Sequence, residues 1–582
     1  MVSQYRAELA RRAAWHRQQR VLTVDYYRIR LKVAFPLPLV RPALPAFPVR
    51  GLPAYPWLTW LSWSYEERLH ALAAHAGLAD DESCREAVRR ELRALASWPG
   101  YRQYDNPDLS AGHLLRLLGT ARRGWPWLGR DVAAAVDAGI ARGVDDLLPR
   151  IEARFGKYPD AAAILGLEKP GQVLQNIPVI GTLGAATAAR AAGLAAAERL
   201  DAIALILVMA TLDLRQDGHT EGVAYDGYVM DFVADWLAGV PAAQREAVMR
   251  HPRLGDLLDE SIALGVPGKL EDVAPLGDVE PVEMPFHLSA HAKLERFESC
   301  PRRRWLLGQC DPARLRADAL AILAGQDRAE APAEAPPAGI LDAHHAVVLR
   351  TGWAADDLAV AASCCRSTMN HIQLDAGSIV IGSGGRWLID DPGYQQYMDT
   401  AERQFTIGPG AHNGPVINGR PQTHRRARLL ERTESAHALR VTLDLTDCYE
   451  IGLDGLAVRR SIWLAAGQRA VVVADRVAGA GLDEVAYHWH GHPEAAWQTT
   501  AGTAALHIGT LALHIQSPHV AIDDAAICRL PGSRGQRTLC VRLTTPPPVV
   551  WWVFSCRDAP PAVTLAGPSG TRLMLGNQRF EA

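Results

Sequence analysis

The chain has 582 residues, which is more than one ordinary hydrophobic core needs, so two large domains are expected. Apolar residues make up 48% and charged residues 21%, a balance typical of globular proteins. The formal net charge of -3 argues against a nucleic-acid binder, because no basic excess is available to neutralise a phosphate backbone. It does not exclude an acidic polymer, since a local groove of arginines can act against a neutral background.

The first 50 residues are predicted to form an N-terminal extension. They begin with a basic, amphipathic stretch that lacks the apolar core and small-residue cleavage site of a secretory signal. This pattern predicts a cytoplasmic protein, or a periplasmic one whose leader has been removed. The most apolar helix-like run, residues 202–212, is too short to cross a bilayer and lies between Asp201 and Asp213. We therefore expect a buried helix there and no membrane span.

Residues 51–325 have apolar side chains at helical spacing and are rich in Ala, Leu, Arg and Glu. Ser64 and Glu67 are three apart, which predicts a capping box that opens a helix at Ser64. Pro and Gly separate many of the amphipathic stretches that follow. Medium helices joined by short turns favour helical hairpins packed side by side in an array or a ring.

Residues 326–339 are rich in Pro, Ala and Glu without an apolar period, as expected for a linker. Beyond the linker, in residues 340–582, the pattern changes to short β-branched or aromatic runs that end near turn residues. A chain of such strands with almost no helical period predicts an antiparallel β-sandwich. The predicted strands include residues 378–381, 457–464, 470–474, 511–515 and 549–554.

Three polar clusters interrupt the apolar pattern, and they are the local sequences with specific character. The first, DGHTEGVAYDGY, occupies residues 217–228 after the predicted buried helix. The second, NHIQLDAGS, occupies residues 370–378 and leads through a strand to Asp-Pro-Gly at residues 391–393. The third is AHNG at residues 411–414, followed by INGRPQ at residues 417–422.

Together these clusters resemble the heparinase II/III family of polysaccharide lyases, in which an α/α toroid precedes an antiparallel β-sandwich. The resemblance covers most of the chain in the same order, with the change from helix to strand near residue 330. Its most specific part is the run NHxxLDAGS, DPG, HN and NG in the β region. The helical region contributes EGxxY, Glu221 to Tyr225, and an Asn-led helix start at Asn176.

The resemblance implies roles for individual residues. Tyr225 matches the catalytic tyrosine, His371 its partner from the β-sandwich, and Asn176 the residue that contacts the substrate carboxylate. Ile177 stands where many relatives have a histidine. Further candidates for substrate binding are Glu221, Arg403, His219 and Gln422.

A structural zinc ion is the one cofactor that the resemblance suggests. Related sandwiches bind it through His, Asp and His, and the matching positions here are Gln373, Asp391 and His412. Glutamine is a poor zinc ligand, so the departure at Gln373 argues against the metal.

The proposed chemistry needs these residue types. Removing the proton on C5 of a uronate pushes negative charge onto the adjacent carboxylate, and groups such as Asn176 or Arg403 would stabilise that charge. A free tyrosine has a pKa of about 10, so it needs a cationic neighbour to ionise near neutral pH, whereas histidine titrates close to neutrality. Whether Tyr225 or His371 takes the proton stays open.

Each candidate also has a purely structural alternative. Tyr225 can be a packing residue, Asn176 only a helix N-cap, and His412 a hydrogen-bonding residue at the domain interface. The tryptophans at positions 57, 60 and 63 can stack on sugars, but core packing is the more common role of such a stripe.

Three functions follow. The first is a lyase whose partner is an acidic polysaccharide containing uronate or aminouronate, with glycosaminoglycan-like, alginate-like and capsular polymers all open. The second is a glycoside hydrolase that uses paired carboxylates, Glu221 with Asp217 or Asp226. The third is a non-catalytic carbohydrate-binding protein, which the departures at Ile177 and Gln373 suggest. The sequence leaves the oligomeric state open.

Overall fold

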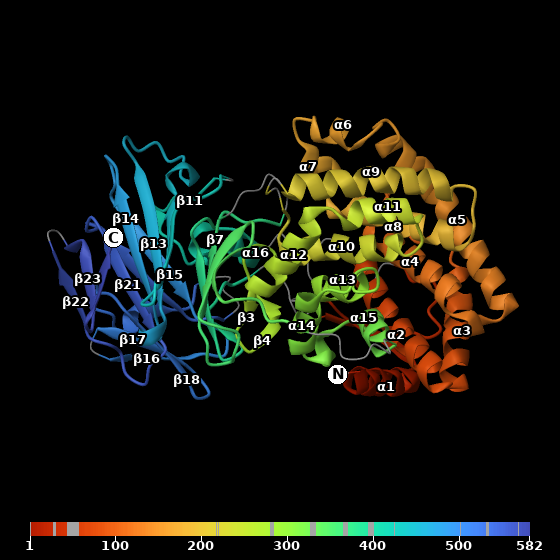
Figure 1. Ribbon diagram of the computed structural model, residues 1–582, viewed down its shortest axis with the longest axis horizontal. Helices are drawn as coiled ribbons and strands as arrows, with labels where there is room; N and C mark the ends of the chain where they lie inside the picture. The colour runs from red at the N-terminus through yellow and green to blue at the C-terminus, as the bar shows by residue number, and fades with distance from the viewer. Residues whose placement is uncertain are drawn as a thin grey trace.

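The computed structural model describes all residues except 1, 27–30, 44–56, 217, 219, 280–284, 326–332, 365–370, 394–400, 424, 501, 531–534 and 568–569. Helices dominate the N-terminal part and antiparallel strands the C-terminal part, and the two parts lie side by side along the long axis (Figure 1). The predicted fold class is therefore confirmed. The boundaries at residues 50, 325 and 339 stay predictions, and half of the predicted linker lies outside the described residues.

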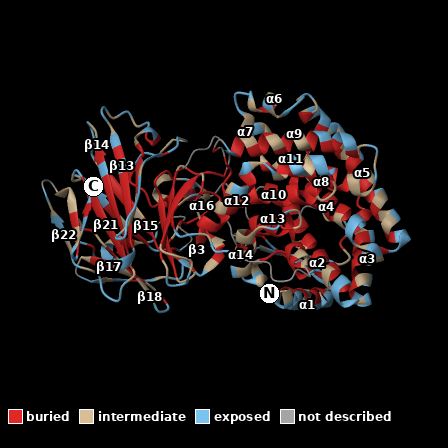
Figure 2. Ribbon diagram, viewed as in Figure 1, coloured by how far each residue is buried: buried red, intermediate tan, exposed pale blue. Residues whose placement is uncertain are grey.

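The helical part encloses a continuous apolar core, which is red in Figure 2, while exposed residues lie on the outer helices. Two short hairpins, β1–β2 and β3–β4, accompany the helices. Their bounds are α1 Val2–Gln18, β1 Val21–Tyr26, β2 Leu31–Pro36, α2 Trp57–Ala79, α3 Glu82–Ala96, α4 Leu109–Gly124, α5 Arg130–Phe155, α6 Ala161–Leu165, α7 Pro170–Val173, α8 Asn176–Ala191, α9 Ala197–Gln216, α10 Val223–Leu237, α11 Ala242–Met249, α12 Pro252–Ala263, β3 Gly265–Val266, β4 Lys269–Val273, α13 Phe286–Leu294, α14 Pro301–Gln309 and α15 Ala317–Ala324.

The start of α2 corrects one prediction. The helix already runs at Trp57, so Ser64 lies inside it and donates its hydroxyl to the carbonyl oxygen of Trp60 at 3.1 Å. The capping box at Ser64 is therefore wrong. Trp57, Trp60 and Trp63 are all buried, and this aromatic stripe extends the helix upstream because it packs into the core. The structural reading of the tryptophans is the one the fold supports.

The apolar run at residues 202–212 lies within α9, as predicted. Its buried side chains, among them Ala204, Leu207 and Val208, join the core of the helical part. Over the described part of the chain, no helix combines the length and apolar character needed to cross a bilayer.

The described residues of the C-terminal part form four antiparallel sheets. Their orders are β5-β6-β7-β8-β9, β11-β12-β13-β14-β21-β18-β17-β16, β10-β15-β20-β19 and β22-β23-β24. The bounds are β5 Gly339–Asp342, β6 Ala346–Arg350, β7 Ala359–Ser363, β8 Ile379–Ser383, β9 Arg386–Ile389, α16 Ala401–Thr406, β10 Val416–Ile417, β11 Arg428–Glu434, β12 Leu439–Asp444, β13 Ala457–Ala465, β14 Ala470–Ala478, β15 Val485–His490, β16 Ala496–Thr500, β17 Thr503–Ile508, β18 Leu511–Gln516, β19 Ile527–Cys528, β20 Thr538–Leu543, β21 Val550–Ser555, β22 Val563–Ala566, β23 Arg572–Leu575 and β24 Gln578–Glu581.

The central strands of the eight-stranded sheet are buried on both faces. In β14, Val471 and Val473 point into the main β core, whereas Val472 and Ala474 point into a second core shared with the three-stranded sheet. This alternation follows from the two-residue period of a strand. Burial on both faces explains why residues 470–474 form an uninterrupted apolar run.

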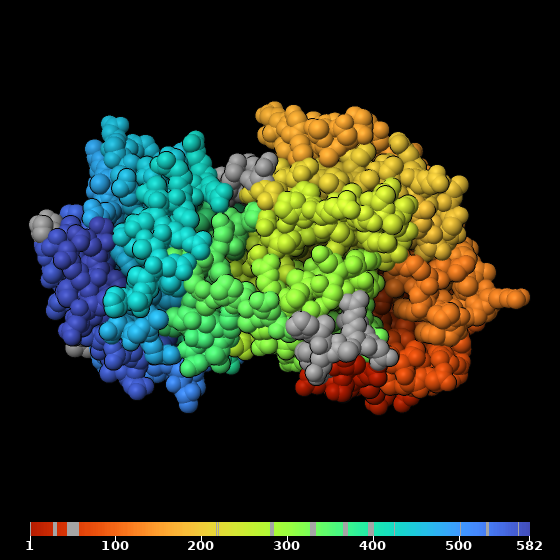
Figure 3. Space-filling model, in the orientation of Figure 1, coloured from red at the N-terminus to blue at the C-terminus, as the bar shows by residue number. Residues whose placement is uncertain are grey.

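The five-stranded sheet joins the two parts of the molecule. One face contributes Val348, Ala361 and Val380 to the core of the helical part, and the other contributes Val347 and Val360 to the β core. Figure 3 shows the green surface of this region directly against the yellow-green surface of the helical part. Buried Arg350 of β6 links the two parts by hydrogen bonds. Its guanidinium donates to the backbone carbonyl groups of Ile262, Ala263 and Gly265.

Candidate active site

The two residues proposed for catalysis meet at the joint between the helical and β parts. The ring of Tyr225, in the first turn of α10, stacks on the imidazole of His371 with centroids 3.6 Å apart and planes 10° apart. Both residues are buried, with an exposed fraction of 5% for Tyr225 and 8% for His371. A tyrosine and a histidine 146 positions apart in the sequence therefore form one contact.

The imidazole of His371 is held on both sides. Its Nδ1 lies 3.0 Å from Asp278 Oδ2, and its Nε2 lies 3.4 Å from Asn176 Nδ2. An ionised carboxylate only accepts hydrogen bonds and the amide nitrogen of asparagine only donates them. This network assigns the proton to Nδ1 and leaves Nε2 as an acceptor.

The backbone around Gly277 is shaped to fit His371. The Asp278 amide donates to the His371 carbonyl oxygen at 2.7 Å, and Gly277 has φ +79°. A Cβ atom on Gly277 would lie 2.8 Å from that same carbonyl oxygen. His371 itself has a positive φ of 75°, an uncommon conformation for a residue other than glycine. The loop after β4 and the loop before β8 are therefore in close backbone contact at this point.

Asn176 is the first residue of α8 and its side chain points into the cluster. Its Nδ2 donates to Glu221 Oε1 at 3.3 Å besides approaching His371. The N-cap position belongs to Gln175 instead. The N-cap reading of Asn176 is therefore wrong, and its carboxamide is free to serve the polar cluster.

Glu221 and Asp226 share one arginine. Arg215 Nη2 lies 2.9 Å from Glu221, and Arg215 Nε lies 2.5 Å from Asp226, which also pairs with Arg253 at 3.1 Å. Burial raises the pKa of Glu221, although Arg215 opposes the shift. Burial also penalises ionised Asp226, but Arg215 and Arg253 outweigh it and hold the pKa of Asp226 below its usual value.

Asp278 collects contacts from the β part. It accepts a hydrogen bond from Gln373 Nε2 at 2.7 Å and lies 3.5 Å from Arg403 Nη1. Burial disfavours its charge, but the hydrogen bond from His371 and the charge of Arg403 lower the pKa of Asp278. Asp278 therefore stays ionised and anchors three residues of the β part to the helical part.

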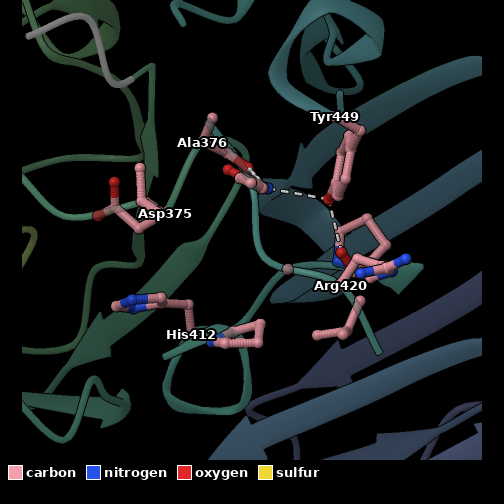
Figure 4. A pocket seen from close by; sticks show the side chains of 11 residues that line it. Asp375, Ala376, His412, Arg420 and Tyr449 are labelled. Carbon is pink, nitrogen blue, oxygen red and sulfur yellow. Dashed lines mark hydrogen bonds between the residues drawn. The ribbon is translucent and has the colours of Figure 1, made fainter. Parts of the chain in front are cut away.

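Gln422 lies in a different place. Its Nε2 donates to the carbonyl oxygen of Ala376 at 2.9 Å and to Tyr449 Oη at 2.8 Å. It lines a small pocket together with Asp375 and His412 (Figure 4). These contacts lie within the β part, so the structure does not bring Gln422 into the cluster around Tyr225.

The three residues at the family's zinc positions make separate hydrogen bonds in the structure. Asp391 Oδ2 accepts from His412 Nδ1 at 3.0 Å, whereas the amide of Gln373 is directed to Asp278. Among the described residues, no set of three metal-binding side chains gathers around Asp391 and His412. A zinc site needs three or four His, Cys or carboxylate ligands, and a neutral carboxamide does not replace one.

The sequence reasoning missed Asp278 and Arg215. Asp278 follows a short strand in a segment without a helical or strand pattern, so only its partners in the folded chain identify it. Arg215 lies in the last turn of α9 and precedes the EGxxY element, so its nearness to Glu221 was a usable signal. His219 and Asp217 lie outside the described residues, as does Asn370.

Comparisons with known proteins agree with this architecture. Residues 344–557 match the family described as Heparinase II/III-like, C-terminal. No curated protein matches the sequence. The crystal structure of heparinase III is similar with a TM-score of 0.61 and 12% identity, over 90% of this chain and 83% of that one.

Two further solved structures extend the comparison. The heparan sulfate lyase of Pedobacter heparinus has a TM-score of 0.56 and 11% identity, over 99% of this chain and 88% of that one. A second heparinase III gene product has a TM-score of 0.58 and 10% identity, over 92% and 86%. At such identities the likeness concerns the fold. Residues 344–557 thus match the C-terminal model of the heparinase II/III-like family, and the chain as a whole has the heparinase III fold.

Proposed function

We propose that the protein is a polysaccharide lyase that cleaves a uronate-containing acidic polysaccharide by β-elimination and leaves an unsaturated uronate end. The observation that carries this proposal is the stacked pair of Tyr225 and His371 at the joint of the two parts. The family match supports a polysaccharide as substrate. The similarity in fold to a heparan sulfate lyase supports a polymer that contains uronate.

The substrate carboxylate would bind beside the imidazole. Asn176 Nδ2 lies 3.4 Å from His371 Nε2. A uronate carboxylate bound to this amide would therefore place C5 of its sugar beside the imidazole. Arg403, 3.5 Å from Asp278, supplies positive charge on the same side. As the C5 proton leaves, charge grows on the carboxylate, and these donors stabilise the transition state more than the ground state.

His371 is the proposed base and Tyr225 the proposed acid. His371 Nδ1 donates to Asp278, so Nε2 can take the C5 proton while ionised Asp278 stabilises the imidazolium. The C5–H and C4–O4 bonds break, the C4–C5 double bond forms, and the Tyr225 hydroxyl protonates the departing O4. A proton passed from His371 to Tyr225 after product release restores both groups.

A direct assay tests the activity. The native protein is incubated with a panel of acidic polysaccharides, and the ultraviolet absorbance of unsaturated uronate is measured beside the number of new reducing ends. We expect both signals to rise together with at least one polymer. Reducing ends without absorbance would identify a hydrolase, and no cleavage of any polymer would identify a binding protein. Either result would refute the lyase.

The hydrolase alternative has weaker support. Of its candidate carboxylates, Glu221 and Asp226 both pair with Arg215 and are buried, and Asp217 lies outside the described residues. An inverting or retaining hydrolase needs two carboxyl groups on opposite sides of a sugar, separated by at least about 5 Å. Two carboxylates gathered by one guanidinium do not present that arrangement.

A leaving-group experiment separates the acid from the base. A uronate substrate with a good leaving group at C4, such as fluoride, does not need protonation of O4. We expect Tyr225→Phe to remain active on this substrate but not on the polymer, and His371→Ala to be inactive on both. The reverse pattern would exchange the two roles.

A further inference from the structure

Two cysteines lie close together at one edge of the four-stranded sheet. The sheet has the order β10-β15-β20-β19, so the short strand β19 forms that edge. Cys528 is the last residue of β19, and Cys540 lies in β20. Their sulfur atoms are 2.6 Å apart. Among the described cysteines, this is the one pair whose sulfur atoms are in contact.

The strand register places both side chains on the same face of the sheet. Cys528 pairs with Thr538, and Cys540 follows two residues later in β20. Because side chains alternate with a period of two along a strand, Thr538 and Cys540 point to the same side, which is also the side of Cys528. The pairing of the two strands therefore holds the sulfur atoms together. A disulfide bond of about 2.05 Å needs only a small adjustment of the two side chains.

The surroundings of the two thiols differ in how they affect reactivity. Both cysteines are partly exposed, so a small reagent can reach them. Burial and the neighbouring Cys528 raise the pKa of Cys540, which keeps its proton near neutral pH. His488 in β15 lies opposite Cys540, and burial lowers the pKa of its imidazole. It therefore offers no positive charge that would stabilise a Cys540 thiolate, and Cys528 is the sulfur expected to react first.

We propose that Cys528 and Cys540 form a redox-active pair that closes to a disulfide and cross-links β19 to β20. The oxidant is a small-molecule disulfide such as oxidised glutathione. The Cys528 thiolate attacks one of its sulfur atoms, forms a mixed disulfide and releases one thiol. Cys540 then loses its proton, attacks the Cys528 sulfur and releases the second thiol. The protein gives up two protons and two electrons, and the reagent is reduced to two thiols.

The bond would stabilise the edge of the sheet. β19 consists of Ile527 and Cys528, and these two residues make its pairing with β20. A cross-link between Cys528 and Cys540 confines about a dozen residues of the unfolded chain to a loop, which lowers the entropy of the unfolded state. The oxidised protein is therefore the more stable form. The pair would be closed in oxidising surroundings and open in reducing ones.

Peptide mapping by mass spectrometry tests the pair in the native protein. The reduced protein is incubated with oxidised glutathione, the remaining thiols are alkylated, and disulfide-linked peptides are identified. We expect Cys528 linked to Cys540 as the main product. Cys300, which is also partly exposed, should remain a thiol or carry glutathione. Unlinked Cys528 and Cys540 at the end of the incubation, or a link from either one to another cysteine, would overturn the proposal.

Serine variants test the order of attack and the effect on stability. Cys540→Ser should stop at the mixed disulfide on Cys528, whereas Cys528→Ser should react little at Cys540. Oxidation should raise the Tm of the native protein by about 2 °C or more and leave the Tm of both variants unchanged. Cys300→Ser is the matched control and should behave like the native protein.

Two results of the Tm measurement would refute the stabilising cross-link. One is an unchanged Tm of a native protein in which mapping shows the bond. The other is an equal rise in the native protein and in the Cys528→Ser and Cys540→Ser variants. If a serine variant does not fold, peptide mapping of the native protein alone decides whether the bond forms.

Discussion

Two buried polar clusters of this molecule are built in opposite ways. In the helical part, Lys293 Nζ lies 2.7 Å from Asp231, 2.6 Å from Asp235 and 2.6 Å from Asp318, and the three carboxylates raise its pKa despite burial. At the joint, the phenol of Tyr225 meets the imidazole of His371.

The two clusters differ in what their polar groups do: one set stabilises the fold, and the other is proposed to take part in a reaction. The Lys293 cluster lies on α10, α13 and α15, and one ammonium occupies the place where three carboxylates could hold a metal ion. The joint cluster combines a phenol, an imidazole and a carboxamide from segments on both sides of the interface. Burial and charge alone therefore do not mark a functional site.

Tyr225→Phe gives the largest effect that the comparison predicts. The variant loses the proposed acid but no packing, so polymer cleavage should fall about a thousandfold. Its free energy of unfolding should stay within about 1 kcal/mol of the native value. Ultraviolet assay and denaturant titration measure the two quantities. Tyr158→Phe, on the surface of the helical part, is the control and should change neither. Full activity of Tyr225→Phe would refute the role.

Lys293→Met should produce the opposite result. It removes the one cation that contacts all three buried carboxylates, so the free energy of unfolding should fall by about 3 kcal/mol or more. Denaturant titration measures it, with Arg250→Gln as the exposed control, which should cost less than about 1 kcal/mol. A Lys293→Met protein as stable as the native one would contradict the structural role.

Gly277→Ala should loosen the joint cluster without changing its residues. The added Cβ would lie 2.8 Å from the His371 carbonyl oxygen. We expect cleavage to fall about tenfold to hundredfold, because small displacements of catalytic groups are costly. Gly419→Ala is the matched control, since Gly419 also has a positive φ, +65°, but no atom within 4 Å of the new Cβ. Equal losses in both variants would assign the effect to backbone strain.

The pair of His412 and Asp391 gives the smallest expected effect. Burial would lower the pKa of His412, but Asp391 outweighs it and raises this pKa above the ordinary value. A raised histidine pKa stabilises the fold below about pH 6.5, and the contribution is lost as pH rises through the raised pKa. His412→Gln should therefore cost about 1 kcal/mol more at pH 6.5 than at pH 9.

Asp375 and His490 are further described titrating groups that interact with His412. Burial raises the pKa of Asp375 to about 6 and lowers that of His490 to about 3, so both groups titrate mainly below the chosen window. Denaturant titrations of native protein and His412→Gln at both pH values provide the measurement. A cost that is larger at pH 9 would show that neutral His412 is the stabilising form.

The strands and buried helices were predictable because their periodicity is local. The predicted runs at residues 457–464 and 470–474 lie within β13 and β14, and the run at 202–212 lies within α9. The start of α2 was not, because buried Trp57 outweighs a capping box that depends only on Ser64 and Glu67.

The candidate site, too, could be predicted only in part from the sequence. The resemblance predicted Tyr225, His371 and Asn176. In the structure, His371 stacks on Tyr225 and lies next to the amide of Asn176. Asp278 could not be found, since its role depends on the fold of two distant loops. The placement of Gln422 beside Tyr449 likewise depends on packing within the β part rather than on its own sequence neighbours.

The five-stranded sheet has a consequence for modularity. Because Val348, Ala361 and Val380 belong to the helical core, the segment that carries the family signature cannot stand alone without exposing an apolar wall to water. A recombination event that exchanged the helical half would have to supply a replacement surface of matching shape. The two halves are therefore one structural unit, even though each has its own architecture.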